Sequence, residues 1–505
     1  MPDASEILSS LHRRGIKVWI DKEQLHLQAP TGMLLPEELQ ELRILKVEII
    51  ELLRQTEFDI QPRPPGCTVP LTPMQMFSWN YAEQGRASER TCRTALRVQG
   101  NLNTRSLERS LEAVIERHQS LRTRIVCIDG TPTQQIDAAC GACFKEIDLS
   151  GLSALTVEEE AKRIAEEFLR EKFDLSVGPL FAARLLRLSS HEFILILALD
   201  HVISDAVSVE ILSKEIWTLY RQAEQGLPFS IPKPVQFADY VVWQQLTYGT
   251  WLKQHEAYWR QRLAGATRIP LVPKYRLLDA ERPGGLVLNI PFGDTLSAKL
   301  RELARREKIQ LAIVIFSIFT AVMLRWCKQN DLVIKFLISG RHHSKLENMI
   351  GVLSEFVHVR IAVTQKTSFL DLLRQGSLEF HSAFEHHDSG RVPEFMPEWA
   401  WQLDFTDIKF QWAPSSTEPG LTEKGPSQAN ARDGISIQPI AFTVVKPVDF
   451  LPYFYDSPGG IGCYVMYRPD VFAPGAVERF GRHLQTCGQE LVERPFARVN
   501  SILLR

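Results

Sequence analysis

A histidine and an aspartate four residues apart are the first candidates for chemistry in this chain. His201 follows an apolar run from Phe193 to Leu199, which is typical of a buried strand, and Asp205 precedes apolar residues at helical spacing. We therefore predict a strand that ends near the histidine and a helix that begins after the aspartate. An imidazole held by a rigid element is suited to accept a proton near neutral pH, although two such residues also occur by chance with only structural roles.

The surrounding segment, Asp200-His201-Val202-Ile203-Ser204-Asp205-Ala206, resembles the HHxxxDG signature of nonribosomal peptide synthetase condensation domains. Asp200 stands in place of the first histidine, and Ala206 stands in place of the glycine. Because adjacent strand residues point to opposite faces, we expect Asp200 to face away from the reaction and the base to be retained. The resemblance implies that His201 is a general base or orients the nucleophile, and that the N–H of Ala206 or Val207 faces the oxyanion.

The aspartate of the motif forms an ion pair in the family that this chain resembles, and this pair fixes the loop. We accordingly expect Asp205 to be structural rather than catalytic. Arg341, which follows an apolar segment from Val333 to Ser339, is the favoured partner, and Arg122 is the alternative.

Other segments occur in the order expected for the same family. They are Leu71–Gln75, Arg117–Arg124 (similar to RHxxLRT), Phe173–Leu180, Phe237–Trp243 (similar to YxDFAxW) and Ile350–Arg360 (similar to IGxFVNTxxxR). Each segment is weak evidence alone, but the order is specific. His386-His387-Asp388 imitates a catalytic pair, yet it matches the HQD motif of the family better, so we assign it no catalytic role.

The resemblance implies an α/β (α+β) fold with two chloramphenicol-acetyltransferase-like lobes in a V-shaped pseudo-dimer. A chain of 505 residues is too long for one ordinary core, which agrees with several domains. We expect an N-terminal lobe over residues 69–245 and a C-terminal lobe over residues 246–505. Substrates are expected to meet at His201 in a tunnel between the lobes.

Residues 1–58 form a separate unit with an α-β-β-α pattern. A helix is expected over 5–14, two short strands over 16–20 and 25–29, and one amphipathic helix over 36–54. The unit resembles the β-hairpin docking domains that precede condensation domains and bind the C-terminal tail of a partner carrier protein by strand addition. The predicted hairpin residues are Ile16, Val18, Ile20, Leu25 and Leu27, and residues 59–68 are a proline-rich linker.

Composition narrows the class of protein. A hydrophobic fraction of 45%, a charged fraction of 23% and a net charge of −2 indicate a soluble globular protein with no nucleic-acid or membrane partner. No signal peptide is recognisable, and the apolar segment 311–324 is shorter than the roughly 20 residues of a membrane span, so we predict a buried helix. Cys140 and Cys143 are assigned neither metal nor redox chemistry, and the chain is expected to be reduced and cytoplasmic.

The predicted function is acyl transfer from the phosphopantetheine thioester of an upstream acyl or peptidyl carrier protein to a small-molecule amine or alcohol. No bound cofactor and no metal are expected. Because no carrier segment precedes the end at Arg505, chain release is the favoured step. Two alternatives stay open: a catalytically inactive recruitment domain, which Asp200 and Ala206 favour, and an acyltransferase that uses coenzyme A, which the docking unit disfavours.

Overall fold

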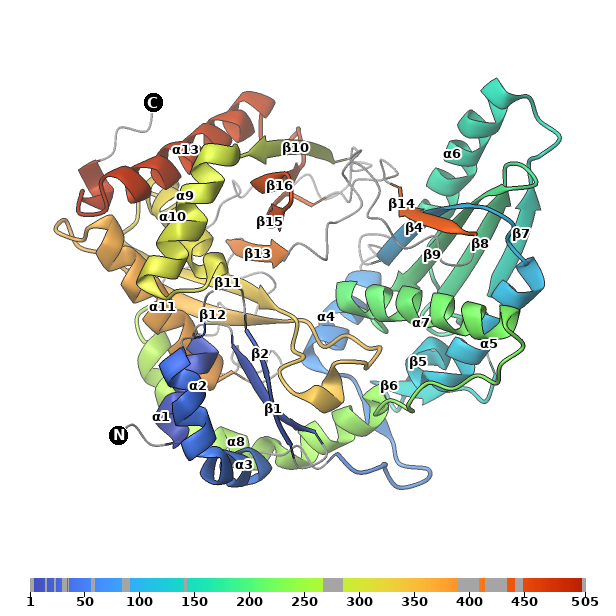
Figure 1. The fold of residues 1–505 in the computed structure, drawn as a ribbon, viewed down its shortest axis with the longest axis horizontal. Helices are drawn as coiled ribbons and strands as arrows, with labels where there is room; N and C mark the ends of the chain where they lie inside the picture. Colours follow the sequence, from blue (N-terminus) through green and yellow to red (C-terminus); the bar gives the residue numbers. More distant parts are fainter. Residues whose placement is uncertain are drawn as a thin grey trace.

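The computed structural model describes the chain from residue 4 to residue 501 with gaps. Residues 14–15, 22–23, 30–33, 35, 56–59, 84–90, 140–142, 267–284, 388–407, 414–433 and 441–447 lie outside the described part. Within it, a small N-terminal unit precedes two larger lobes. The lobes stand side by side, and the long helix α8 (Phe237–Leu263) runs below them (Figure 1).

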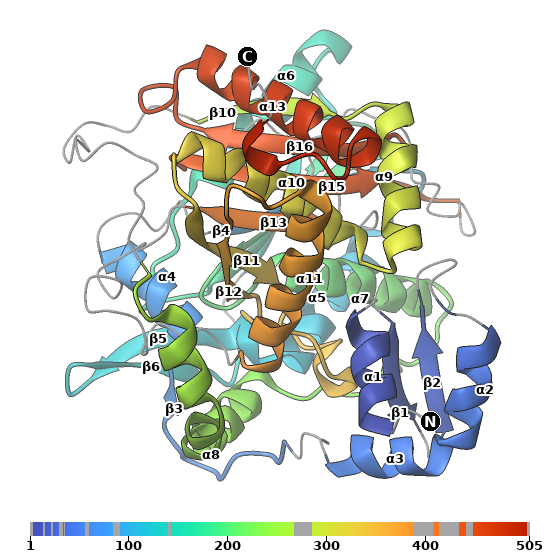
Figure 2. The ribbon, with the colours of Figure 1, turned by 90° about the vertical axis from the view of Figure 1, so that its left-hand side faces the viewer.

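The N-terminal unit has the predicted α-β-β-α order. Its elements are α1 (Ala4–Arg13), β1 (Lys17–Asp21), β2 (Gln24–Gln28), α2 (Pro36–Ile44) and α3 (Lys46–Gln55). The prediction of one helix over 36–54 is wrong, because the chain turns at Leu45. Separate helices let Leu42 and Ile49 both pack with Leu11 of α1 in one small core. The unit lies at the end of the molecule opposite the C-terminal helix α13 (Pro474–Glu493) (Figure 2).

The N-terminal lobe is built on a five-stranded sheet. Its order is β14 (Ser436–Pro439), β4 (Thr91–Gln99), β9 (Glu192–Asp200), β8 (Phe181–Arg187) and β7 (Phe144–Asp148). Helices α5 (Thr104–Arg117) and α7 (Ala206–Glu224) cover one face, and α6 (Ala154–Arg170) covers the other. Odd-numbered residues of β9 pack against α5 and α7, and even-numbered residues pack against α6. Burial on both faces explains the unbroken apolar run that ends before His201.

A smaller sheet of β3 (Val69–Pro70), β6 (Thr131–Ile136) and β5 (Thr123–Ile128) completes this lobe with α4 (Pro73–Glu83) and a short 3-10 turn (Gln119–Arg122). The linker that precedes it is held to α8, since Ile60 is buried and Arg63 forms an ion pair of 2.6 Å with Asp239. Helix α8 is continuous through residues 245 and 246, where we predicted the boundary between the lobes.

The C-terminal lobe is built on a six-stranded sheet. Its order is β10 (Leu286–Pro291), β16 (Gly460–Tyr467), β15 (Phe450–Ser457), β13 (Lys409–Ala413), β11 (Asp331–Ile338) and β12 (Glu355–Ala362). It packs with α9 (Asp294–Glu307), α10 (Leu311–Trp326), α11 (Phe369–Glu385) and α13. Helix α10 is buried along most of its length, as predicted. Among the described residues, no single helix meets the length and hydropathy of a membrane span, and only the sharply bent pair α9 and α10 does so jointly.

One strand crosses between the lobes, which the sequence did not indicate. β14 comes late in the chain but pairs antiparallel with β4 of the N-terminal lobe, with Ser436 opposite Gln99. Figure 1 shows it at the edge of the sheet that carries β4, β9 and β8. The two lobes are therefore tied by backbone pairing as well as by α8.

The expectation of a fully reduced chain is wrong at one position, because Cys143 is disulfide-bonded. Cys143 immediately precedes β7. Cys140, the other cysteine of the Cys-x-x-Cys motif, lies outside the described residues.

Candidate active site

His201 lies on a tight turn between β9 and α7. The strand ends at Asp200, whose carboxylate accepts a hydrogen bond of 2.8 Å from the backbone N–H of Val202. The carbonyl of Asp200 also accepts a bond of 2.9 Å from the hydroxyl of Ser204. Asp200 is 2% exposed, whereas His201 is half-buried. An aspartate that bonds the backbone two residues on is a turn former, so Asp200 shapes the loop that carries the imidazole.

The same turn is held from a second side by Gln75 of α4. Its side-chain amide donates a bond of 2.9 Å to the carbonyl of Val202. Its oxygen accepts bonds from the backbone N–H of Thr72 at 3.0 Å and from the side chain of Gln134 at 3.1 Å. The motif at 71–75, which we identified only as a family landmark, thus buttresses the turn of His201.

Asp205 caps α7 and joins the two lobes. Its side chain accepts a bond of 2.8 Å from the N–H of Ser208 and pairs with Arg341 at 2.7 and 3.0 Å. The N–H groups of Leu353 and Ser354 donate to it at 3.0 and 2.9 Å. Both charged side chains are almost fully buried. The predicted pairing with Arg341 is confirmed. Because Asp205 is buried and its carboxylate is bonded to groups of both lobes, we assign it a structural role.

The electrostatics of Asp205 balance two opposing effects. Burial raises the pKa of its carboxyl, but the charge and hydrogen bonds of Arg341 and the bonds from Ser208 outweigh burial, so the pKa is lowered. Asp205 is therefore the ionised partner of a buried pair rather than a proton carrier at neutral pH.

Ser208 is part of this buried group, and the sequence analysis missed it. Its hydroxyl oxygen lies 2.8 Å from the carboxylate of Asp205 and accepts a bond of 3.1 Å from the N–H of Gly351 in the other lobe. It also accepts a bond of 3.1 Å from Arg341. A buried serine three residues after a capping aspartate was the available signal, since such a residue is hydrogen-bonded when buried.

Arg122, the alternative partner for Asp205, has a different role. Its guanidinium donates to backbone carbonyls of Ile115, Glu116, Asp137 and Ala138. These bonds join the C-terminal part of α5 to the segment that follows β6. The proposal of Arg122 as an ion-pair partner is therefore wrong, because its donors are engaged with the backbone of its own lobe.

The predicted oxyanion donors lie at the start of α7. Ala206 is the first residue of the helix, and Val207 follows it. N–H groups of a first helical turn have no intrahelical acceptor and carry partial positive charge, so they suit a developing oxyanion. An alanine in place of glycine keeps this N–H.

Glu210 is a second titratable group on α7, which the sequence analysis did not single out. Glu210 is exposed, but partial desolvation, with a contribution from the charge of Asp205, raises the pKa of its carboxyl to about 7. Tyr453 on β15, in the other lobe, interacts with the charge of Glu210. Burial and this charge raise the pKa of the Tyr453 hydroxyl to about 12. Glu210 therefore lies close enough to Tyr453 of the C-terminal lobe for their charges to interact, and its pKa is suited to proton transfer.

Four of the five predicted hairpin residues pack in the core of the N-terminal unit. Ile16 and Val18 are buried, Leu25 and Leu27 are half-buried against the same core, and Ile20 pairs with Leu25 across the hairpin. The hairpin is a two-stranded sheet, so each strand lacks a second neighbour within the described residues. A binding tail would thus meet the backbone edge rather than these side chains.

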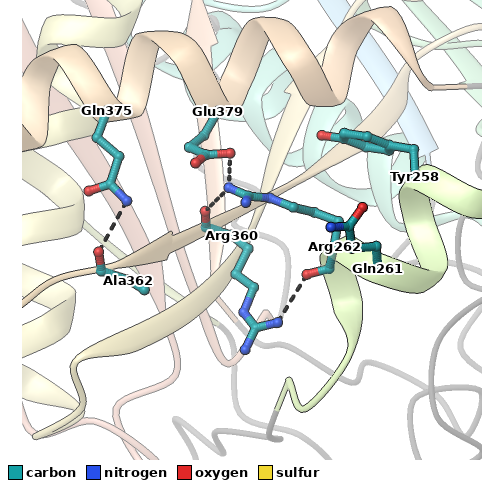
Figure 3. Close-up of a pocket in the computed structure, with 7 residues that line it drawn as sticks. All are labelled: Tyr258, Gln261, Arg262, Arg360, Ala362, Gln375 and Glu379. Atoms are coloured by element: carbon teal, nitrogen blue, oxygen red, sulfur yellow. Dashed lines mark hydrogen bonds and ion pairs between the residues drawn. The ribbon is translucent and has the colours of Figure 1, made fainter.

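A cavity of about 430 Å³ lies away from this site, between α8, β12 and α11. Figure 3 shows Arg262 directed at Glu379 and Gln375 directed at the carbonyl of Ala362. Ala362 is the last residue of β12, roughly 23 Å along the strand from Glu355, whose neighbour Ser354 contacts Asp205. The charged groups in the cavity are satisfied by one another and by carbonyls, so we assign it no role in the chemistry.

Comparison with known families agrees with this geometry. Residues 67–504 match the family model described as condensation domain, and residues 5–55 match the one described as TubC N-terminal docking domain. A linear gramicidin synthase of Brevibacillus parabrevis is 29% identical over 415 residues, which is 79% of this chain and 8% of that protein. The chain spans no more than 29% of the length of the first curated relatives it matches.

Solved structures share the fold. The cyclization-docking bidomain of the EpoB synthetase from Sorangium cellulosum superposes with a TM-score of 0.73 at 21% identity, covering 98% of this chain and 99% of that one. The X-domain in its complex with OxyB from teicoplanin biosynthesis also reaches 0.73 at 21% identity, covering 88% and 97%. The chain is thus similar in fold both to the X-domain and to the cyclization-docking bidomain.

Proposed function

Because this chain belongs to the condensation domain family and begins with a TubC-type docking domain, we propose that it transfers an acyl or peptidyl chain from a carrier-protein thioester to an amine or hydroxyl group. The observation that carries the proposal is the support of His201. Asp200 and Gln75 fix its turn, and the buried pair of Asp205 and Arg341 fixes the helix that follows.

The chemistry asks little beyond position and proton transfer. The nitrogen or oxygen of the acceptor attacks the thioester carbonyl, His201 accepts the proton that the nucleophile loses, and the thiolate of phosphopantetheine leaves with the electrons of the C–S bond. The proton then passes to the thiolate or to water. The N–H groups of Ala206 and Val207 stabilise the oxyanion of the tetrahedral intermediate.

The carrier protein is recruited at the N-terminal unit in this proposal. A hairpin whose two strands have no further strand neighbour among the described residues supports binding of an extended tail as an added strand. The acceptor is a small amine or alcohol, so that product leaves the assembly line, as we expected from the sequence. Phosphopantetheine arrives on the partner and is not bound permanently.

The EpoB comparison and Glu210 together favour a second candidate for the product. When the acceptor is cysteine, serine or threonine, its side chain can attack the new amide and lose water to form a ring. Loss of water needs a group that donates and accepts protons near neutral pH, and partial desolvation raises the pKa of Glu210 to about 7.

Intact-protein mass spectrometry of an acyl-loaded carrier tests these proposals. The carrier is incubated with this protein and soluble amines, alcohols or cysteine, and its loss of the acyl chain is followed together with the released product. A released amide or ester supports chain release. A product lighter by one water than the linear amide supports ring closure. Product found only on an added second carrier would reject the free acceptor. Transfer from an acyl coenzyme A at the same rate as from the acyl carrier would favour the coenzyme A alternative. No product from any donor would favour the inactive recruitment domain.

A further inference from the structure

A group of two histidines and one carboxylate lies in the C-terminal lobe, outside the residues of the proposed reaction. His342 follows β11, Glu355 begins β12 and His387 follows α11. One possible ligand atom from each residue lies within 4.8 Å of the other two. We propose that His342, Glu355 and His387 bind one divalent transition-metal ion. This departs from the expectation of no metal in the sequence analysis.

The carboxylate of Glu355 gives the clearest indication that a cation binds here. Glu355 is 3% exposed, and one of its oxygens lies 3.2 Å from Nε2 of His387. Its other oxygen is buried and has no hydrogen-bond partner among the residues that the structure describes. A buried carboxylate oxygen that makes no bond is costly, and a bound cation would satisfy it.

The orientation of His387 is that of a metal ligand. Its Nδ1 lies within hydrogen-bond distance of the carbonyl of Phe384, and its ring stacks on the ring of Phe384. Because a carbonyl only accepts, Nδ1 carries a proton, and Nε2, which lies on the side of Glu355, is the ring atom that could bind a metal ion. Metal-binding histidines commonly donate their other ring N–H to a backbone carbonyl in this way.

His342 supplies the third ligand and a route of entry. His342 is exposed to solvent, and the centroid of its ring lies 5.5 Å from that of His387. The ring also has a hydrogen bond with the backbone of Gly340. Its exposed side gives an ion access to the buried carboxylate of Glu355.

The ligand set selects the class of metal. Two imidazoles and one carboxylate suit zinc or iron(II), which leave further positions for water. Bonds of about 2.1 Å in tetrahedral geometry would place ligand atoms roughly 3.4 Å apart. His387 and Glu355 already lie close to this separation at 3.2 Å, and the ligand atoms of all three residues lie within 4.8 Å of one another.

The position of the site assigns it a structural role. Glu355 follows Ser354, whose N–H donates to Asp205, and His342 follows Arg341, the ion-pair partner of Asp205. A bound ion would tie the end of α11 to both segments that hold the junction between the lobes. The ion would thus fix the junction and have no part in the acyl transfer.

Metal binding by the full chain tests this inference. The protein is stripped with a chelator, dialysed and titrated with zinc by calorimetry, and separately with cobalt(II) to record visible absorption. We expect one zinc ion per chain, a cobalt spectrum of nitrogen and oxygen ligands, and a melting temperature that rises with free zinc. The variants Glu355→Gln, His342→Asn and His387→Asn should each bind zinc at least about tenfold more weakly.

His191→Asn is the matched control, since His191 is exposed in the N-terminal lobe and lies outside the group. It should bind zinc as the wild type does. Cobalt bands of thiolate ligation would reveal binding at exposed Cys127 instead and would reject the site. Substoichiometric zinc, or equal affinity of wild type and Glu355→Gln, would mean that His387 and Glu355 form only a buried ion pair.

Discussion

At the scale of single residues, the imidazole of His201 is the group on which the proposed transfer depends. Replacement by alanine removes the base, and we expect the rate to fall by ~10²–10⁴. The fold should persist, because Asp200 shapes the turn through the backbone of Val202 and not through the ring. Single-turnover loss of the acyl chain from the carrier, with circular dichroism as the fold control, measures this. A variant with nearly wild-type turnover would instead support a recruitment domain.

Asp205 should matter for stability more than for chemistry. Asp205→Ala leaves the guanidinium of Arg341 buried without its carboxylate, and we expect a loss of about 3–5 kcal/mol in urea unfolding. Asp137→Ala is the matched control, because Asp137 pairs with Arg124 in a half-exposed setting and should contribute at most about 1 kcal/mol. If the two variants were equally stable, and only the Asp205 variant inactive, Asp205 would have a catalytic role.

The raised pKa of Glu210 should make the free energy of unfolding depend on pH in a specific way. Its native pKa of about 7 lies above the ordinary value of 4.5, so the native state binds this proton more tightly than the unfolded state. Its contribution to stability is therefore full below about pH 4.5 and is lost as the pH rises through about 7. Glu210→Gln, which cannot ionise, should gain stability relative to wild type across that window. Glu224→Gln, at the exposed end of the same helix, is the control. Parallel unfolding curves for Glu210→Gln and wild type at both ends of the window would contradict the shift.

Sequence reasoning reached the residues whose signal is local. His201 and Asp205 share one short motif, and Arg341 directly follows a recognisable strand. Ser208 and Gln75 were not assigned roles, because their partners lie in other segments of the chain. The same reason hid the cluster of His342, Glu355 and His387, whose residues come together only when β11, β12 and α11 pack.

At the scale of elements, sequence patterns located strands and helices better than they located breaks. The apolar run of β9 showed a strand buried on both faces, but the turn at Leu45 depends on packing of α2 and α3 against α1. Similarly, the continuity of α8 could not be predicted, because it follows from contacts with both lobes. Local periodicity does not report these contacts.

The N-terminal unit should act on the carrier and not on the reaction. Deletion of residues 1–58 removes the hairpin β1–β2 but leaves the turn of His201 and the junction at Asp205 unchanged. We expect unchanged turnover of small thioester mimics and weaker transfer from the native carrier, seen as a raised KM with an unaltered kcat. Restoring the unit as a fusion is the control. Equal losses with both kinds of donor would show that the unit only supports folding.

At the scale of the whole molecule, two ties between the lobes have different physical origins. One is the buried group of Asp205, Ser208 and Arg341, which depends on charge and hydrogen bonds. The other is β14, which depends on backbone pairing with β4. Both ties join the two lobes, so loss of either should alter the relative position of the lobes before it alters the proton transfer itself.

The second tie can be tested at Gly100, which follows β4. Its φ is +125°, and a Cβ there would lie 2.2 Å from the carbonyl oxygen of Gly434, just before β14. Gly100→Ala should therefore push β14 from β4, speed hydrogen exchange in both strands and slow acyl transfer. Gly151→Ala, at a position with open space, is the matched control and should change neither. Exchange in β14 that is equally slow in both variants would mean that the pairing tolerates the clash. Slow exchange in β14 with impaired transfer would place the effect of Gly100 in the N-terminal lobe itself.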